Sequence, residues 1–267
     1  MHVSDDLYTG PVGGPNAFSL VSTTGFIYGN SGLPVATGWP ADGTPTNQYG
    51  VGPLGRVVFR NIQPLALATA NLAVLQAPTA GTALTLVAGT GIQTAVNPLN
   101  GQVLYVLDVP RCISLTSSAN LSGITFLVTM IDEYGQTATQ LVTGPNNNTV
   151  VVKKACIGVL SIVPQGTSAS TVSVGTSDTY GLPFRCIDAG YIVSVKWAGV
   201  LAQNAGTLTV ADQTSPATNL TGDPRGTYAI SGAASNGTNR LLIAQHVDAS
   251  QCGPFAKLVN AIGVPQA

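Results

Sequence analysis

The clearest pattern in the chain is a period-two alternation of apolar and polar residues over residues 124–143. Apolar side chains occupy every second position in its first half, at Ile124, Phe126, Val128 and Met130. The polar sequence Asp132-Glu133-Tyr134-Gly135 interrupts the alternation, which then resumes over residues 137–141. Because successive side chains of a strand point to opposite faces, this pattern predicts two half-buried strands joined by a short turn. The sequence therefore predicts a β-hairpin over residues 124–143.

Short apolar-rich runs of the same kind recur from about residue 56 onward, separated by Gly, Pro, Asn and Asp. They cover residues 57–59, 84–87, 103–107, 149–152, 157–163, 171–174, 191–197, 207–210 and 241–247. Many short strands without helices between them are typical of a sandwich or a barrel. We therefore predict an all-β fold, built as an antiparallel β-sandwich of the jelly-roll or Ig-like kind. Residues 65–75, where four alanines lie among leucines, fit either a short helix or a strand.

The chain divides by composition into an arm and a strand-forming region. Residues 1–55 contain repeated Gly-Pro steps such as Gly10-Pro11 and Gly52-Pro53, which leave little room for long regular elements. We predict an extended N-terminal arm over residues 1–55 and a β-sandwich domain over 56–165. Residues 166–267 form either a second small β-domain or the continuation of the sandwich. Isolated aromatic residues in the arm are the candidate anchors for contact with a partner: Phe18, Phe26, Tyr28, Trp39 and Tyr49.

Charged residues are scarce. The 267 residues include 10 Lys and Arg and 11 Asp and Glu, or 8% of the chain, against about 25% in an average domain. Such a balance produces no positive field to attract nucleic acid, so we expect no nucleic-acid partner. The chain contains no apolar run of about 18 residues and no cationic start followed by an apolar stretch, so we expect neither a membrane span nor a secretory signal. A nearly uncharged β-protein is poorly protected against association, which predicts a homo-oligomer or a part of a larger assembly.

Candidate chemistry is equally sparse, and we predict that the protein is not an enzyme. The only histidines are His2 and His246, and the motifs of serine hydrolases, zinc proteases and phosphate-binding loops are absent from the sequence. We interpret Asp132 and Glu133 as solvated turn residues rather than as a calcium site or a catalytic pair. The four cysteines, Cys112, Cys156, Cys186 and Cys252, have irregular spacing and are expected to be reduced and unpaired. We expect no catalytic residue, cofactor, metal or small-molecule substrate.

Several segments resemble virion structural proteins of tailed bacteriophages. They lie at residues 109–111, 113–118, 122–129, 132–136, 143–145, 174–185 and 221–228. The resemblance covers about residues 105–245 and excludes the arm. It implies a capsid cement, or decoration, protein that binds the outside of the head, as a homotrimer in contact with the major capsid protein. The alternative that it implies is a neck, tail or head-fibre component with a receptor- or glycan-binding role. In either case the protein belongs to the virion and is assembled in the cytoplasm of the bacterial host.

Overall fold

The computed structural model describes residues 56–201, 206–214 and 216–247. In this part of the chain the fold is all-β, as predicted, and the only helical element is the single 3₁₀ turn Ala189–Tyr191. No helix among these residues is long and apolar enough to cross a membrane. The fold consists of two sheets, and the larger sheet contains strands from both sides of residue 165.

The larger sheet has ten strands and is antiparallel throughout. Its main path runs in the order β12-β13-β9-β4-β8-β5-β6, and β2, β3 and β7 pair with strands of this path. The bounds are β2 Ala73–Gln76, β3 Gln93–Val96, β4 Val103–Asn120, β5 Thr125–Ile131, β6 Thr137–Thr143, β7 Asn146–Val151, β8 Cys156–Pro164, β9 Val172–Gly181, β12 Thr207–Thr209 and β13 Thr227–Ala229.

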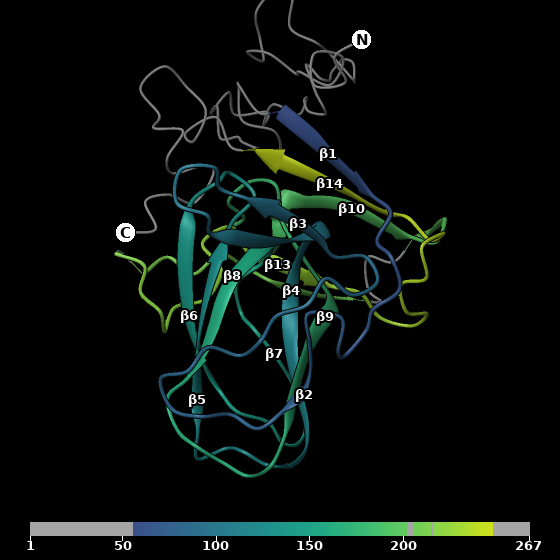
Figure 1. Ribbon diagram of the computed structural model, residues 1–267. Coiled ribbons are helices and arrows are strands. Elements are labelled where there is room, and N and C mark those ends of the chain that lie inside the picture. The colour runs from purple at the N-terminus through teal and green to yellow at the C-terminus, as the bar shows by residue number, and fades with distance from the viewer. Residues whose placement is uncertain (1–55, 202–205, 215, 248–267) are drawn as a thin grey trace, which may run out of the picture. The chain divides into compact units, whose positions relative to one another are not determined.

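The sheet curls because β4 is shared between two groups of strands. The first half of β4 pairs with β3 and β8, and its second half pairs with β7 and β9. Figure 1 shows β5, β6 and β8 on one side of this curl and β2, β4 and β9 on the other. The space between them holds one apolar core, which includes Leu72, Ile113, Leu115, Phe126, Val128, Met130, Val159, Ile162 and Val174. Each such side chain contributes about 1.5–3 kcal/mol on burial.

The predicted hairpin is confirmed as β5 and β6. The two strands pair in register from Thr125 opposite Thr143 to Ile131 opposite Thr137. The turn is closed by the N–H of Gly135, which donates to the carbonyl of Asp132 at 3.0 Å. Gly135 has φ 83°, a left-handed conformation that glycine adopts without steric cost. The local sequence thus determines both the strands and the turn.

Strand β4 is longer than the sequence predicted. The predicted run covers residues 103–107, whereas the strand continues past Pro110 to Asn120. Pro110 is tolerated because the register with β8 shifts between Val106 and Arg111, where the regular ladder is interrupted. The charges of Asp108 and Arg111 are accommodated inside the strand because the two side chains form an ion pair of 2.8 Å.

Residues 65–75 form no helix; the segment is extended and ends in β2. Its backbone groups bond to other strands instead of to each other, which excludes a helix. The N–H of Leu72 donates to the carbonyl of Val174, and the carbonyl of Ala68 accepts from the N–H of Thr176. The segment lies so close to β9 that a Cβ atom on Gly175 would clash with the carbonyl of Ala68. Glycine at this position therefore permits the close backbone approach.

The smaller sheet has four strands in the order β1-β14-β10-β11. The strands are β1 Arg56–Ile62, β10 Ile192–Trp197, β11 Val200–Leu201 and β14 Leu241–Val247. Strands β10 and β11 are joined by the two-residue turn Ala198-Gly199, whose φ angles are 53° and 81°. Two successive positive φ angles match the right-handed twist of the flanking strands, which explains the tight hairpin.

Candidate functional site

Most charged side chains of the sandwich point into the protein. No charged residue occurs between Arg60 and Asp108, and between Asp108 and Asp178 the charged residues are Arg111, Asp132, Glu133, Lys153 and Lys154. Three of these side chains, Arg111, Asp132 and Lys154, are at most 3% exposed. Glu133 is half-buried, and only Lys153 is exposed. The outer surface of this described stretch therefore carries almost no charge.

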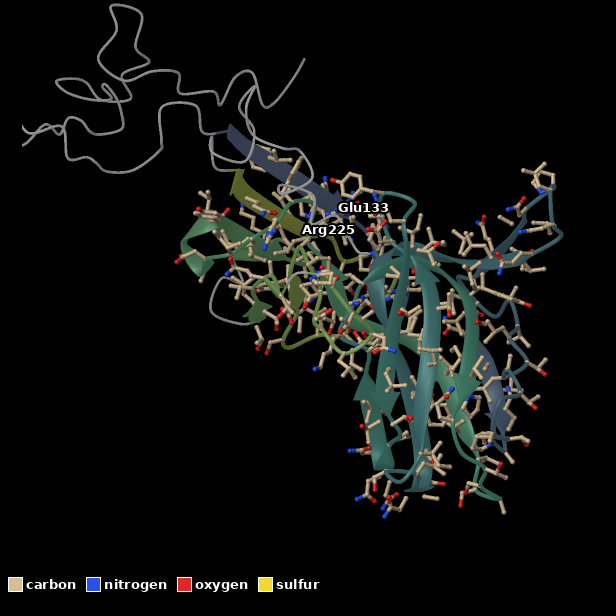
Figure 2. The ribbon with its side chains drawn as sticks, turned by 90° about the vertical axis from the view of Figure 1, so that its left-hand side faces the viewer. Glu133 and Arg225 are labelled. Carbon is tan, nitrogen blue, oxygen red and sulfur yellow. The ribbon has the colours of Figure 1, made fainter. Side chains whose placement is uncertain are left out.

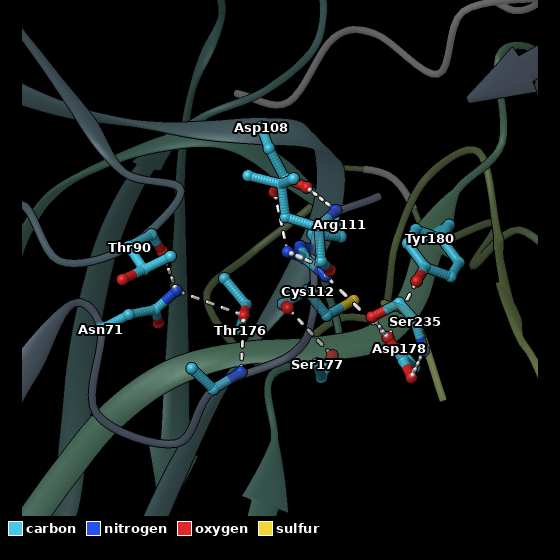
Figure 3. A network of polar contacts seen from close by, with 12 residues as sticks. Asn71, Thr90, Asp108, Arg111, Cys112, Thr176, Ser177, Asp178, Tyr180 and Ser235 are labelled. Carbon is cyan, nitrogen blue, oxygen red and sulfur yellow. Dashed lines mark hydrogen bonds and ion pairs between the residues drawn. The ribbon is translucent and has the colours of Figure 1, made fainter. Parts of the chain in front are cut away.

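Arg111 is the centre of a buried polar network between β4 and β9 (Figure 3). Its guanidinium lies 2.8 Å from the carboxylate of Asp108 and 3.9 Å from that of Asp178. Asp178 also accepts hydrogen bonds from the hydroxyls of Tyr180 and Ser235, at 2.8 and 2.6 Å. Burial and the neighbouring Asp178 carboxylate raise the pKa of Tyr180, so its phenol remains a proton donor. Because these carboxylates are occupied by partners within the fold, we assign the network a structural role.

A second buried ion pair lies at the β5–β6 turn, and it corrects the interpretation of Asp132 as a solvated residue. Asp132 is 3% exposed, and its carboxylate accepts a hydrogen bond of 2.9 Å from the guanidinium of Arg225. The other carboxylate oxygen accepts from the N–H groups of Tyr134 and Gln136. Figure 2 labels Arg225 and the neighbouring Glu133. The interpretation was wrong for Asp132 because its partner lies far away in the sequence, where no local pattern indicates it.

The described residues provide little for catalysis. Cys112, Cys156 and Cys186 are buried free thiols, and Cys252 lies outside the described residues. Burial raises the pKa of Cys156 to about 12 and that of Cys186 to about 11, so both remain protonated and unreactive at neutral pH. No three His, Cys, Asp or Glu side chains gather as a metal site in the described ranges. His246 belongs to β14, and His2 lies outside the description.

One open edge of the large sheet is covered by the chain itself. Strand β6 is the last strand of the main path, and the segment around Thr218 and Asn219 lies against it. The N–H of Leu141 donates to the carbonyl of Asn219 at 2.6 Å. The buried amine of Lys154 donates to the carbonyls of Thr139 in β6 and Thr218 in the covering segment, at 3.0 and 2.7 Å. The low charge of the chain predicted association with other protein, but at β6 the sheet edge is covered by the chain itself.

The β3–β4 hairpin is the most exposed apolar feature of the described structure. It extends away from the body of the sandwich (Figure 2). All four residues of β3 are exposed, Val96 to 60%, and Leu99 at the tip is 92% exposed. These two apolar side chains are candidates for contact with another molecule, because contiguous exposed apolar surface is the feature that marks contact sites.

The turn at the tip is fixed by its own hydrogen bonds. The N–H of Asn97 donates to the carbonyl of Gln102, and that of Gly101 donates to the carbonyl of Asn97. The side-chain oxygen of Asn97 accepts from the N–H of Leu99 at 2.9 Å. That of Asn100 accepts from the N–H of Gln102 at the same distance. The hairpin therefore presents Leu99 in a preorganised conformation, which lowers the entropy cost of binding.

The site that the sequence proposed and the site that the structure reveals are different. The predicted anchors, Phe18, Phe26, Tyr28, Trp39 and Tyr49, all lie outside the described residues. Leu99 and Val96 were not selected as anchors from the sequence. The dipeptide Asn100-Gly101 could have located them, because Asn-Gly is typical of tight hairpin turns. It lies between Val96 and the apolar run that begins at Val103.

No protein-family model, curated protein or solved structure matches this chain. The candidate site is therefore defined by its own geometry. It consists of the nearly uncharged outer surface of residues 61–177 and the apolar tip of the β3–β4 hairpin, and we call it the contact surface.

Proposed function

We propose that the protein is a structural component of a tailed-phage virion, a cement protein that binds the outside of the head and stabilises the shell. The resemblance of residues 105–245 to phage virion proteins supports this class. The observation that carries the proposal is the contact surface, where uncharged outer faces are combined with an ordered apolar hairpin tip. The proposed partners are other copies of the chain, as a homotrimer, and the major capsid protein.

An uncharged surface suits association of identical copies. Copies related by a symmetry axis bring the same residues together near that axis. Any charge close to the axis would face its own copies with the same sign, at an electrostatic cost. Between Arg60 and Asp108 the chain has no charged residue that could produce this repulsion. Contacts made by such a surface also depend little on salt, because there are few exposed charges to screen. Both properties suit a shell component.

The apolar tip supplies an exposed side chain that a partner can bury. Interfaces are dominated by a few side chains that fill pockets on the partner. Leu99 is 92% exposed, so burying it against a partner would remove nearly all of its apolar surface from water, contributing about 1.5–3 kcal/mol per copy. In a homotrimer or on a capsid lattice this contribution is repeated at every copy.

Decoration of heads by the purified protein tests the proposal. Heads that lack the protein are incubated with the full chain at low and at high salt, and imaging of the particles gives its position and occupancy. We expect binding on the outer head surface that changes little with salt. Leu99→Ser should lower the affinity by about tenfold or more, the equivalent of 1.4 kcal/mol or greater. The matched control is Leu220→Ser, because Leu220 is 63% exposed in the segment that covers β6.

The location of the protein decides between the candidate functions. Binding at the neck, tail or a head fibre would replace the cement role by the alternative role. Absence from the particle would overturn the assignment to the virion. Equal losses for the Leu99 and Leu220 variants would show that the hairpin tip is not the contact.

A further inference from the structure

A pocket of about 510 Å³ opens where β7, β9, β12 and β13 meet. Its floor is one face of three adjacent strands, because Thr179 pairs with Ala229 and Thr209 pairs with Thr227 across them. The volume lies within the range of about 300–1,000 Å³ that is usual for small-molecule sites. Val151 and Val210, each 40% exposed, give the pocket an apolar wall.

The pocket also gathers charges that are rare elsewhere on the sandwich. Lys153, the one exposed charged side chain between Arg60 and Asp178, lines it together with Asp212 and Asp223. The carboxylate of Asp223 is buried and already accepts hydrogen bonds from three backbone N–H groups, so Lys153 and Asp212 are the charges available to a ligand. The carboxylate of Asp212 is held in place, since its oxygens accept hydrogen bonds from the N–H groups of Gly222 at 2.8 Å and Thr214 at 2.9 Å. These hydrogen bonds lower the pKa of Asp212 to about 2, so the carboxylate is ionised at neutral pH.

The composition of the walls restricts the class of ligand. A phosphate or another anion would meet the carboxylate of Asp212, and a cation would meet the ammonium of Lys153. The lining has no aromatic ring on which a nucleobase could stack. A neutral polyol satisfies all groups at once. Its hydroxyls can donate to the carboxylate and accept from the ammonium and from the Thr179 and Thr209 hydroxyls, and its C–H face can pack on the valines.

We propose that this pocket binds a neutral sugar, presented either as a free monosaccharide or as a residue of a surface glycan. The binding residues are Asp212 and Lys153, with Thr179 and Thr209 as hydroxyl partners and Val210 as the apolar wall. This activity goes beyond the cement role and does not depend on it. Its test uses the isolated full chain, so that failure of either proposal is distinguishable from failure of the other.

Ligand-observed and amide-shift NMR on the full-length protein provides the test. The probes are glucose, galactose, mannose and N-acetylglucosamine in one arm, and the neutral polysaccharide dextran in another. Inorganic phosphate and glycine serve as the anionic and zwitterionic alternatives. We expect at least one sugar to shift the amides of Val210 and Gly222 saturably at millimolar concentrations. A response to dextran that exceeds that of its monomer, glucose, would assign the source as a glycan, and the reverse would assign it as a free sugar.

Two variants test whether Lys153 and Thr209 bind the sugar, and both leave the hydrogen bonds of Asp212 in place. Lys153→Ala and Thr209→Val should each weaken sugar binding by about tenfold, the usual effect of losing one hydrogen bond in a site. Lys196→Ala and Thr94→Val are matched controls, because both side chains are exposed and outside the pocket lining. They should leave the affinity unchanged.

A third variant blocks the pocket. Val210→Trp should abolish binding while the amide spectrum outside the pocket stays that of the folded protein. The proposal is overturned if no sugar shifts the pocket amides, if phosphate or glycine alone does so, or if the pocket and control variants respond alike.

Discussion

Replacing Asp132 by Ala should destabilise the protein by about 3–5 kcal/mol, the usual cost of removing one partner of a buried ion pair. The substitution removes a carboxylate that accepts three hydrogen bonds, from the N–H groups of Tyr134 and Gln136 and from the guanidinium of Arg225. It leaves the charge of Arg225 buried, because the side chain of that residue is 3% exposed. A change in a solvated turn would instead stay within about 0.5 kcal/mol. The expected loss for a buried ion pair is several-fold larger than that for a solvated turn, so the free energy of unfolding distinguishes the two cases.

Urea denaturation of the full-length protein at neutral pH gives the free energy of unfolding. Glu133→Ala is the matched control, since Glu133 is the adjacent residue in the same turn and is half-buried. The double variant Asp132→Ala with Arg225→Met should lose less than the sum of the two single losses, because it removes both charges of the ion pair together. A loss below about 1 kcal/mol for Asp132→Ala would show that the Asp132–Arg225 pair does not stabilise the fold, since even one unsatisfied buried group costs that much.

Three further predictions concern close packing, acid stability and thiol chemistry. Gly175→Ala should lower the free energy of unfolding by about 1–3 kcal/mol, because the new Cβ atom would clash with the carbonyl of Ala68. Gly123→Ala is the control, because Gly123 has open space around it, and it should change the free energy little. Thermal unfolding of both variants measures the difference. The low pKa of Asp212, about 2 against an ordinary 3.8, stabilises the fold above about pH 4. This stabilisation should disappear as the pH falls toward 2, and urea midpoints across that range should fall less steeply in Asp212→Asn than in the wild type. The pKa of the Cys156 thiol is about 12 in the fold against an ordinary 9.0, so the folded state favours the protonated thiol. The stability that this preference contributes is fully present below pH 9 and should be lost as the pH rises to 12. Titration in denaturant without reductant should find four thiols, and two or fewer would demonstrate disulfides.

The elements that the sequence predicted well are those whose signals are local. The β5–β6 hairpin follows from alternation over 124–143 and from a turn that ends in Gly135, and both lie within one short segment. The all-β class follows similarly from many short runs without helical periodicity. Local propensity was insufficient for residues 65–75, because the carbonyl of Ala68 and the N–H of Leu72 bond to β9, which lies about a hundred residues further along the chain.

The candidate sites depend on tertiary contacts that no segment reveals alone. The pocket is built from four strands and a loop, with Lys153 and Asp212 brought together from separate segments. The uncharged outer surface could be recognised only partly from composition. Composition shows that charges are few, but only the structure shows that Arg111, Asp132 and Lys154 are buried. The tip of the β3–β4 hairpin is the exception, since its Asn-Gly turn is a local signal.

The covered edge of β6 restricts how copies of this chain can associate. A nearly uncharged β-protein with an open strand edge would be expected to pair edge to edge with its neighbours. Here Lys154 is buried at that edge and donates to the carbonyls of Thr139 and Thr218, although burial lowers its pKa. Pairing by β6 would require this amine to give up the Thr139 carbonyl and the Leu141 N–H to give up its bond to Asn219. Contacts made by this edge of the sheet must therefore use side chains and not strand addition.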